Sequence, residues 1–571
     1  MAAIICCAIV SGCAGSRVIP ATAVADQSRF AAEPFQEAPR SIAAVPAFHG
    51  IHLTDLGAAP SSATLKLAIT LRYRNEARLD DLIRSQITPG SGQFHRWLSN
   101  AQFKAAFAPS ARDYKSVLNT MTRSGLTIDR TYDNRTVIDV TGSVAAIDRL
   151  FRTSIHRVSQ RGHAEQFINV RPARAPEALK SVILSVDGLN TTDELRPEYV
   201  LPTHASEPLP QTHGGRSGLF GPVSKQTGMA GYAPRAFWRA YDLPINHRSP
   251  SGKRYDGSGR TSGILINGDP SASDIGAFLR YFGIARNGPP TKVVLVDTKV
   301  PPQATVESVL DAETILGNAP GTALYIYEVP KLSYAPVTDA YNQVVSDNAV
   351  DTLNSSFGVY EQDAGNAPLT WNEIAKQGAA KGITFHAASG DFSGLVAPSA
   401  PADCPYFVSV GGTSLSIGAR GTWAYETGWS GTGGGVSGLF AQPPWQRNVA
   451  GTIDRGRNSP DVSFDGDPAS GTALYIFGTW NSTANPVGGT SLSSPIFGAL
   501  ITELDQMNNG RLGLPSAKIY SIWKRRGYGT IEKPLFHDIT QGCSGIYCAG
   551  RGYDLVTGIG SIDGTNLSRF L

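Results

Sequence analysis

The sequence predicts a large α/β unit with a doubly wound, mostly parallel sheet, preceded by a smaller α+β unit. Three observations indicate this division. The 571 residues exceed one ordinary core. Short apolar runs alternate with helical patterns in the last 60% or so of the chain, and a stretch rich in Pro, Gly and Ser separates them from a front part with its own strands and helices. With 41% hydrophobic and 17% charged residues, the composition excludes a disordered chain, a coiled coil and collagen.

The first residues predict export from the cytoplasm. Residues 1–12 are almost wholly small or apolar, and Arg17 and a polar stretch follow, so we assign residues 1–25 to a signal peptide or lipoprotein leader. The sequence VSGC at residues 10–13 resembles a lipoprotein cleavage box in which Cys13 would be lipidated, and both alternatives stay open. We therefore expect a secreted or extracytoplasmic protein that reaches a membrane only if Cys13 is lipidated.

Strand and helix patterns in the front part fit a ferredoxin-like βαββαβ layout. Residues 64–74 alternate like a half-buried strand, and residues 135–142 form a second candidate. The other signals are helical patterns at 113–124 and 144–151 and extended stretches near Phe167 and Val182. We assign residues 45–196 to this small unit and residues 197–230, which lack apolar periodicity, to an accessible linker.

The large unit, residues 231–571, contains the apolar runs that predict its sheet. They lie at residues 261–268, 292–298, 322–329, 350–358, 382–390 and 406–412. Such runs are typical of strands that are buried on both faces. Because functional side chains of these sheets gather at the carboxyl ends of the strands, polar residues just after the runs are the first candidates.

The motif GTSLSSP at residues 489–495 marks a candidate nucleophile. It precedes an apolar helical stretch, with Pro495 expected in the first turn. Ser491 would then lie near a helix N-terminus, where backbone N–H groups favour developing negative charge. A helix cap is the simpler alternative for Gly-Thr-Ser alone, but the full pattern resembles the nucleophile motif of subtilisin-like serine peptidases.

A histidine base for this serine is missing. After residue 230 the histidines are His247, His386 and His537, and none has the His-Gly setting that such a base usually takes. A carboxylate can replace imidazole where the medium is acidic enough to match its pKa.

Three carboxylates are candidates for that role. Glu307 and Asp311 are four residues apart in an apolar helical segment, hence on one face, where burying two like charges raises at least one pKa. A solvated acidic face is the alternative. Asp391 follows the run 382–390 in a Gly/Ser turn and would, if protonated, donate a hydrogen bond to an oxyanion, although turn chemistry also explains an Asp there.

At these residues the chain resembles the sedolisins, a family of serine-carboxyl peptidases with a subtilisin-like fold. The resemblance implies that Ser491 is the nucleophile, Glu307 the general base, Asp311 its supporting acid and Asp391 the oxyanion-hole acid. Supporting matches are NSSFG at 354–358, CPYFVSVGGTSL at 404–415, GTGGGVSGLF at 431–440 and SPDVSFDGDP at 459–468.

The resemblance also assigns the small unit and the C-terminal loop. Residues 90–128 resemble an activation propeptide of the pro-kumamolisin kind, and cleavage within the linker would release it. The tail resembles the family's calcium loop, which implies one structural Ca²⁺ held by the Asp538 and Asp554 carboxylates and the carbonyls of Ile539, Gly550 and Gly552. Cys543 and Cys548 in this loop either form a disulfide or remain free, and Cys404 has no evident partner.

Together these features predict a self-processing endopeptidase that works in acid through Ser, Glu and Asp. Its expected partners are polypeptide substrates and its own propeptide, and we expect a monomer. With a net charge of +3 and no basic stripe, nucleic acid is not an expected partner. The alternatives are a tripeptidyl-peptidase of the same family, a catalytically inactive secreted binding protein on this fold, and a neutral subtilisin-type enzyme, which the missing histidine disfavours.

Overall fold

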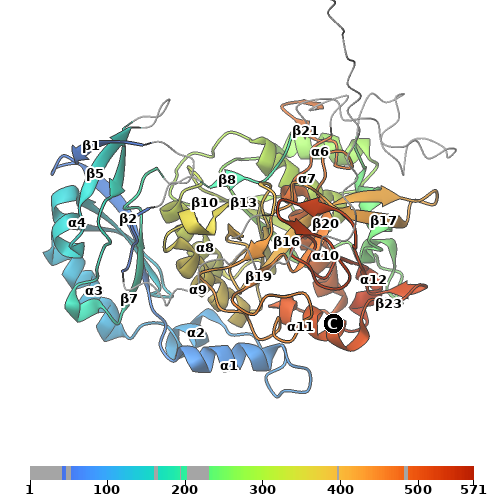
Figure 1. The fold of residues 1–571 in the computed structure, drawn as a ribbon, viewed down its shortest axis with the longest axis horizontal. Helices are drawn as coiled ribbons and strands as arrows, with labels where there is room; N and C mark the ends of the chain where they lie inside the picture. Colours follow the sequence, from blue (N-terminus) through green and yellow to red (C-terminus); the bar gives the residue numbers. More distant parts are fainter. Residues whose placement is uncertain are drawn as a thin grey trace, which may run out of the picture.

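The chain folds into two units that pack side by side, the small unit toward the left of Figure 1 and the large unit filling the rest. The structure is a computed structural model that describes residues 41–46, 53–159, 165–192, 195–201, 231–394, 398–480 and 486–571. The predicted leader, Cys13 and most of the predicted linker lie outside the described residues.

The small unit contains a four-stranded antiparallel sheet in the order β3-β4-β2-β7, which confirms the predicted ferredoxin-like layout. The strands are β2 (Thr64–Leu71), β3 (Thr127–Thr131), β4 (Val137–Ser143) and β7 (Ile183–Asp187), and the helices that cover one face are α3 (Ala111–Arg123) and α4 (Val144–Phe151). A separate sheet contains β1 (Thr54–Ala58), β5 (Ile155–Ser159) and β6 (Gln166–Asn169), so the extended stretch near Phe167 is not part of the main sheet.

The large unit contains an eight-stranded, mostly parallel sheet, as predicted. Its strands are β9 (Thr261–Ile266), β10 (Lys292–Leu295), β11 (Ala323–Glu328), β12 (Thr352–Ser355), β14 (Thr384–Ala388), β16 (Phe407–Ile417), β17 (Trp423–Gly428) and β20 (Val462–Asp465). The path β10-β11-β9-β12-β14-β16-β17 places β12 and β14 at the centre, and β17 is the antiparallel edge strand. The carboxyl ends of these central strands therefore meet at one edge.

Helices cover both faces of this sheet. They are α5 (Pro234–Ala240), α6 (Ala272–Tyr281), α7 (Val306–Asn318), α8 (Tyr334–Asp347), α9 (Ala367–Ala380), α10 (Thr490–Met507), α11 (Pro515–Arg526) and α12 (Gly564–Ser568). Of these, α8 and α9 lie between the sheet and the small unit, whereas α7 and α10 pack against each other on the opposite side (Figure 1). Apolar side chains from both layers form one continuous core.

The small unit contacts the large unit through two surfaces. The face of its main sheet that α3 and α4 leave uncovered packs on α8 and α9. The helices α1 (Glu76–Gln86) and α2 (Asn100–Ala106) extend beneath the large unit, where Phe103 and Leu79 share a buried cluster with Ala379 and Leu514. Trp97 packs against Gly382, where a β-carbon would lie 2.6 Å from the indole ring.

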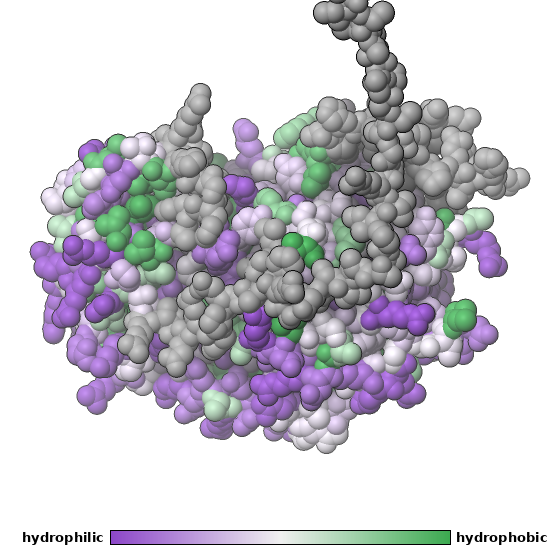
Figure 2. All heavy atoms as spheres, viewed as in Figure 1, coloured by the Kyte–Doolittle hydropathy of each residue, from purple (hydrophilic) through white to green (hydrophobic). Residues whose placement is uncertain are grey.

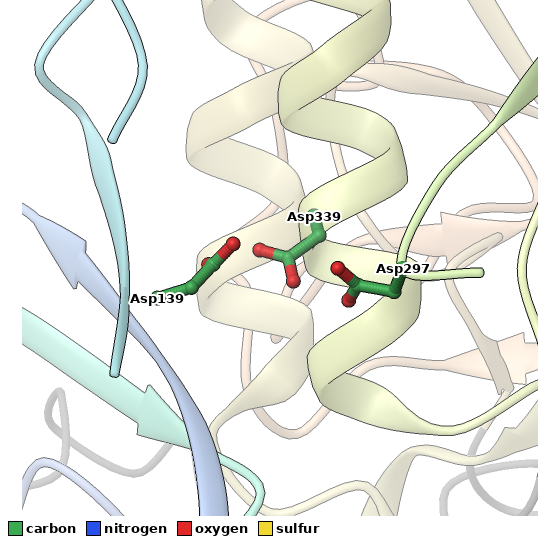
Figure 3. Close-up of side chains that lie close together, drawn as sticks. All are labelled: Asp139, Asp297 and Asp339. Carbon is green, nitrogen blue, oxygen red and sulfur yellow. The ribbon is translucent and has the colours of Figure 1, made fainter. Parts of the chain in front are cut away.

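Three aspartates meet where the two units pack (Figure 3). Asp139 lies on β4, Asp297 follows β10 and Asp339 lies on α8. Arg130 Nε donates to Asp139 Oδ2 at 2.7 Å and its Nη2 pairs with Asp297, while Lys66 Nζ lies 2.7 Å from Asp297 Oδ1. Burial, followed by the Asp139 charge, raises the pKa of Asp339 far above its usual range, so this acid stays protonated beside its neighbours.

Because two cations already neutralise this cluster, we interpret it as an ion-pair network that joins the units and not as a metal site.

Figure 2 shows mostly hydrophilic side chains along the lower edge of the same view, where α1 and α11 lie, and only small separate hydrophobic patches. Within the described ranges, no helix is sufficiently long and apolar to cross a membrane.

We predict that Arg130→Ala lowers the free energy of unfolding of the full chain by about 2–3 kcal/mol, because it leaves the buried Asp139 carboxylate without its cation. Arg123→Ala, at an exposed position of α3, should change it by less than about 0.5 kcal/mol. Urea-induced unfolding at neutral pH of both variants in a Ser491→Ala background checks this. Equal effects of the two substitutions would contradict the role of the network.

Candidate active site

Ser491 lies in the first turn of α10, and this turn contacts the residues that follow β12 and β14, namely Ser356 and Gly390. The helix begins at Thr490, earlier than predicted, so Pro495 lies in its second turn and not in its first. Gly489 precedes the helix with φ 109°, a conformation that favours glycine. The side chain of Ser491 is fully buried, and its backbone N–H, in the first turn, has no acceptor within the helix.

Glu307 and Asp311 face Ser491 from the neighbouring helix α7. The side chain of Thr305 caps this helix by accepting from the Ser308 N–H, and both carboxyl groups are fully buried. Ser491 Oγ donates to Glu307 Oε2 at 2.9 Å, and Ser356 Oγ donates to Asp311 Oδ1 at 2.6 Å. The predicted one-turn spacing thus places one carboxyl on the serine and the other behind it.

The two acids of α7 form a coupled pair. Burial and then the Asp311 charge raise the pKa of Glu307 well above its usual range, and burial also raises that of Asp311. Glu307 Oε1 and Asp311 Oδ2 accept no hydrogen bond from any described protein group. One proton shared between the two carboxyl groups gives both oxygens a hydrogen-bond partner. With that one proton, the pair carries a single negative charge.

Asp391 lies on the other side of Ser491, three residues after β14 ends. Its Oδ1 accepts from Thr490 N–H at 2.7 Å and from Thr490 Oγ1 at 2.8 Å, while its buried Oδ2 has no partner within the described structure. Burial raises the pKa of Asp391 to about 7, although the bonds from Thr490 act to lower it. Below that pH, Oδ2 holds a proton that it can donate.

The three histidines of the large unit do not approach the serine as bases. His386 is buried on β14, where Nδ1 is 2.9 Å from Ser494 Oγ, and burial lowers its pKa to about 3. His247 pairs with Asp242 near the surface, and His537 stacks on Trp423. The structure therefore agrees with the absence of a histidine base that the sequence indicates.

Several residues of the site were not predicted. Ser356 bridges to Asp311, Asn354 interacts with the same carboxyl group, and Thr490 orients Asp391. Ser356 and Asn354 belong to the NSSFG motif at the carboxyl end of β12, so their place after an apolar run was a usable signal. Glu198, just before the undescribed part of the linker, also lies in the site, and its sequence surroundings gave no indication of this.

In the C-terminal loop, the two predicted calcium-binding carboxylates accept hydrogen bonds from the backbone of Gly550 and Gly552. Asp538 Oδ1 accepts from Gly552 N–H at 3.1 Å, and Asp554 Oδ2 accepts from Gly550 N–H at 3.0 Å. Both carboxylates lie near the Tyr528 hydroxyl, and neither forms an ion pair with a described residue. Carboxylate oxygens without a paired cation are the kind of ligand that Ca²⁺ prefers.

A disulfide joins Cys543 and Cys548. The sequence left open whether these two cysteines are bonded or free. The hairpin that it closes, β26 (Cys543–Ser544) and β27 (Tyr547–Cys548), contacts the turn after Asp391, because Ser544 Oγ accepts from Gly394 N–H at 2.9 Å. Cys404 is buried and unpaired. The disulfide therefore lies beside the loop that holds the third acid.

Together these groups fit acyl transfer. The Ser491 hydroxyl is hydrogen-bonded to the Glu307 carboxyl group, which can accept its proton. Asp391, whose Oδ2 has no partner within the described structure, lies near the Ser491 backbone N–H. Two such donors can stabilise the oxyanion of a tetrahedral intermediate.

Comparisons with known proteins agree with this chemistry. Residues 52–192 match the family model described as "Pro-kumamolisin, activation domain". The chain is 30% identical over 549 residues to sedolisin from Pseudomonas sp. (strain 101), covering 89% of this chain and 87% of that protein. It is 27% identical to kumamolisin from Bacillus sp. (strain MN-32), covering 90% and 93%. The solved structure of Pseudomonas sedolisin (serine-carboxyl proteinase) complexed with two molecules of pseudo-iodotyrostatin is 31% identical, covers 60% of this chain and 97% of that chain, and has a TM-score of 0.52.

Proposed function

Because this chain belongs to the sedolisin family and is a serine-carboxyl peptidase, we propose that it is an exported, self-processing endopeptidase that works in acid through Ser491, Glu307, Asp311 and Asp391. The observation that carries the proposal is the hydrogen bond of 2.9 Å from Ser491 Oγ to the buried carboxyl of Glu307. This bond places a proton acceptor on the nucleophile without a histidine.

In the proposed reaction, Ser491 Oγ attacks the carbonyl carbon of a peptide bond while Glu307 takes the hydroxyl proton. Asp311 shares its proton with Glu307 and so limits the charge that the pair carries. The Ser491 N–H and protonated Asp391 stabilise the oxyanion. Glu307 returns its proton to the leaving amine, and water then hydrolyses the acyl-enzyme by the reverse transfers.

The pH range follows from the protons that this arrangement must hold. Asp391 must be protonated, and the pair of Glu307 and Asp311 must hold one proton. As the pH rises through the raised pKa of Asp391, about 7, the oxyanion loses a donor and gains a negative neighbour. Activity is therefore expected to fall as the pH rises above about 7.

An endopeptidase fits the site better than a tripeptidyl-peptidase. The described chain runs without a break from Leu195 to Leu201 through the site, and Leu195 N–H donates to Leu332 O at 2.9 Å. Four described residues, Leu195 to Glu198, therefore lie before the peptide bond whose carbonyl accepts from the Ser491 N–H. An enzyme that removes tripeptides needs a barrier after the third such residue.

We further propose that the small unit is the propeptide and that the C-terminal loop binds Ca²⁺. The loop would hold the ion with the Asp538 and Asp554 carboxylates and the carbonyl groups of Ile539, Gly550 and Gly552. The ion would supply positive charge to two carboxylates that lack another cation, and it would stiffen the loop beside the disulfide hairpin.

We predict that the acid-processed enzyme cleaves casein in acid, that Ser491→Ala abolishes this, and that activity falls about tenfold per pH unit above pH ~7. Asp391→Asn keeps an N–H donor that has no proton to lose, so the fall near neutrality should disappear although the rate in acid is lower. Asp391→Ala should lose about 10²–10³-fold.

The control for these variants is Asp454→Asn, at an exposed position of a loop, which should keep the wild-type profile. A flat profile through neutrality in the wild type, or an unchanged alkaline limb in Asp391→Asn, would contradict the role of Asp391.

We predict that EGTA lowers the melting temperature of the processed enzyme by several degrees relative to excess Ca²⁺, because an ion at 100 times its Kd stabilises by about 2.7 kcal/mol. Asp554→Asn should remove the difference, and Asp454→Asn should keep it. Thermal denaturation with both additives measures this. Equal melting temperatures of the wild type in EGTA and Ca²⁺ would exclude the site.

A further inference from the structure

Residues 195–201, the end of the small unit and the described start of the linker, lie in the active site as an extended segment. The strand β8 (Arg196–Pro197) pairs antiparallel with β13 (Phe357–Tyr360), the strand after Ser356. Glu198 N–H donates to Ser356 O at 3.1 Å. On the other side of Ser491, Val200 and Gly488 exchange two backbone hydrogen bonds of 3.1 and 3.2 Å. The chain is thus held by its backbone on both sides of the nucleophile, as a substrate would be.

The carbonyl of Glu198 occupies the place where an oxyanion would form. Glu198 O accepts from the Ser491 N–H at 2.9 Å. A β-carbon on Gly489 would lie 2.5 Å from Asp391 Oδ2, 2.6 Å from the Cα of Tyr199, and closer still to Glu198 O. The unpartnered Oδ2 of Asp391 and the carbonyl therefore lie around one point, next to the peptide bond between Glu198 and Tyr199.

The side chain of Glu198 is fully buried, and each of its carboxyl oxygens lies near a hydrogen-bonding group. Its Oε2 accepts from the Asp391 N–H at 2.9 Å, and its Oε1 lies 3.5 Å from Ser399 Oγ. Ser399 Oγ also lies 3.2 Å from Val359 O, to which it can donate. A β-carbon on Gly358 would fall 2.6 Å from Glu198 Oε1, so the glycine leaves room for the carboxyl group.

This position suits an uncharged acid or its amide. Asp391, Glu307 and the Tyr360 hydroxyl are titratable groups near Glu198, and Arg196, the one cation among the described residues that acts on it, is exposed on the same strand. A protonated Glu accepts from the Asp391 N–H through one oxygen and donates to Ser399 Oγ through the other. A Gln side chain does the same with its carbonyl and NH₂ groups. A Lys ammonium would face the Asp391 N–H with no acceptor of its own.

We propose that the bond between Glu198 and Tyr199 is the bond that this peptidase first cuts in its own chain, and that the site holding Glu198 makes it select Glu or Gln before the scissile bond. The proposal rests on the proposed function. Ser491 Oγ forms a bond to the Glu198 carbonyl carbon and the bond from that carbon to Tyr199 N breaks. Glu307 carries the serine proton to the Tyr199 amine, and water then hydrolyses the ester to leave a Glu198 carboxyl terminus and a free serine.

The full-length chain tests the first part. Wild type, Ser491→Ala, Glu198→Gln and Glu198→Lys are acidified, and the earliest product is identified by N-terminal sequencing. We expect a first new N-terminus at Tyr199 in the wild type and in Glu198→Gln, no cut in Ser491→Ala, and a cut at this bond that is slower by at least about tenfold in Glu198→Lys. Glu177→Lys, an exposed position of the small unit, is the matched control and should process normally.

Short peptides test the second part without altering the protein. Processed wild-type enzyme is assayed with peptides that differ only in Glu, Gln, Leu or Lys before the scissile bond. We expect kcat/KM in acid for Glu and Gln to exceed that for Lys by at least about tenfold, with Leu in between because it leaves the Asp391 N–H unpaired.

The outcomes separate the two levels of the proposal. Two results together overturn this inference and leave the proposed function intact. The first is a Ser491-dependent first cut at a bond other than Glu198–Tyr199, and the second is an equal kcat/KM for the Lys and Glu peptides. Absence of Ser491-dependent cleavage of both casein and the chain itself overturns the proposed function. If Glu198→Lys fails to fold, the peptide series alone decides the preference.

Discussion

The active site depends on keeping three carboxyl groups away from water around one serine hydroxyl. Burial disfavours their charged forms, so Glu307, Asp311 and Asp391 retain protons at a higher pH than free carboxylic acids do. The same buried environment lowers the pKa of His386 to about 3, so this imidazole is a weak base, and it contacts Ser494 and not Ser491. Helix packing of α7 on α10 holds the acceptor on the serine, and the sheet edge supplies the other groups. The chemistry thus follows from where the fold excludes water.

The small unit uses the same donors that a substrate would use. Its final strand lies on β13, and the Glu198 carbonyl takes the Ser491 N–H. The small unit also contacts the large unit through the ion-pair network around Arg130 and the packing of Trp97 on Gly382. The docked small unit therefore blocks the site and presents a peptide bond to it, while its anchoring lies elsewhere.

Much of the fold could be predicted because its elements are locally encoded. Apolar runs such as 382–390 have the length of a strand and no competing period, and β14 lies within that run. The pair Glu307 and Asp311 was also visible, since helical spacing places them on one face. The roles of Thr490 and Ser356 depend on contacts between segments far apart in the sequence, and a hydroxyl residue gives no local sign of its partner. The start of α10 was predicted too late, because Pro495 was expected in the first turn. The helix in fact begins at Thr490.

The central claim is that Glu307 makes Ser491 nucleophilic. The most direct measurement is the rate at which a peptidyl fluorophosphonate labels Ser491 in acid, compared between the wild type, Glu307→Gln and Glu313→Gln. Glu313 is a buried acid on the same helix that accepts from the Tyr475 N–H at 3.0 Å, so its Gln variant is a matched control. The account predicts that Glu307→Gln labels about 10²–10⁴-fold more slowly while Glu313→Gln labels as the wild type does. Labelling of Glu307→Gln at the wild-type rate would contradict it.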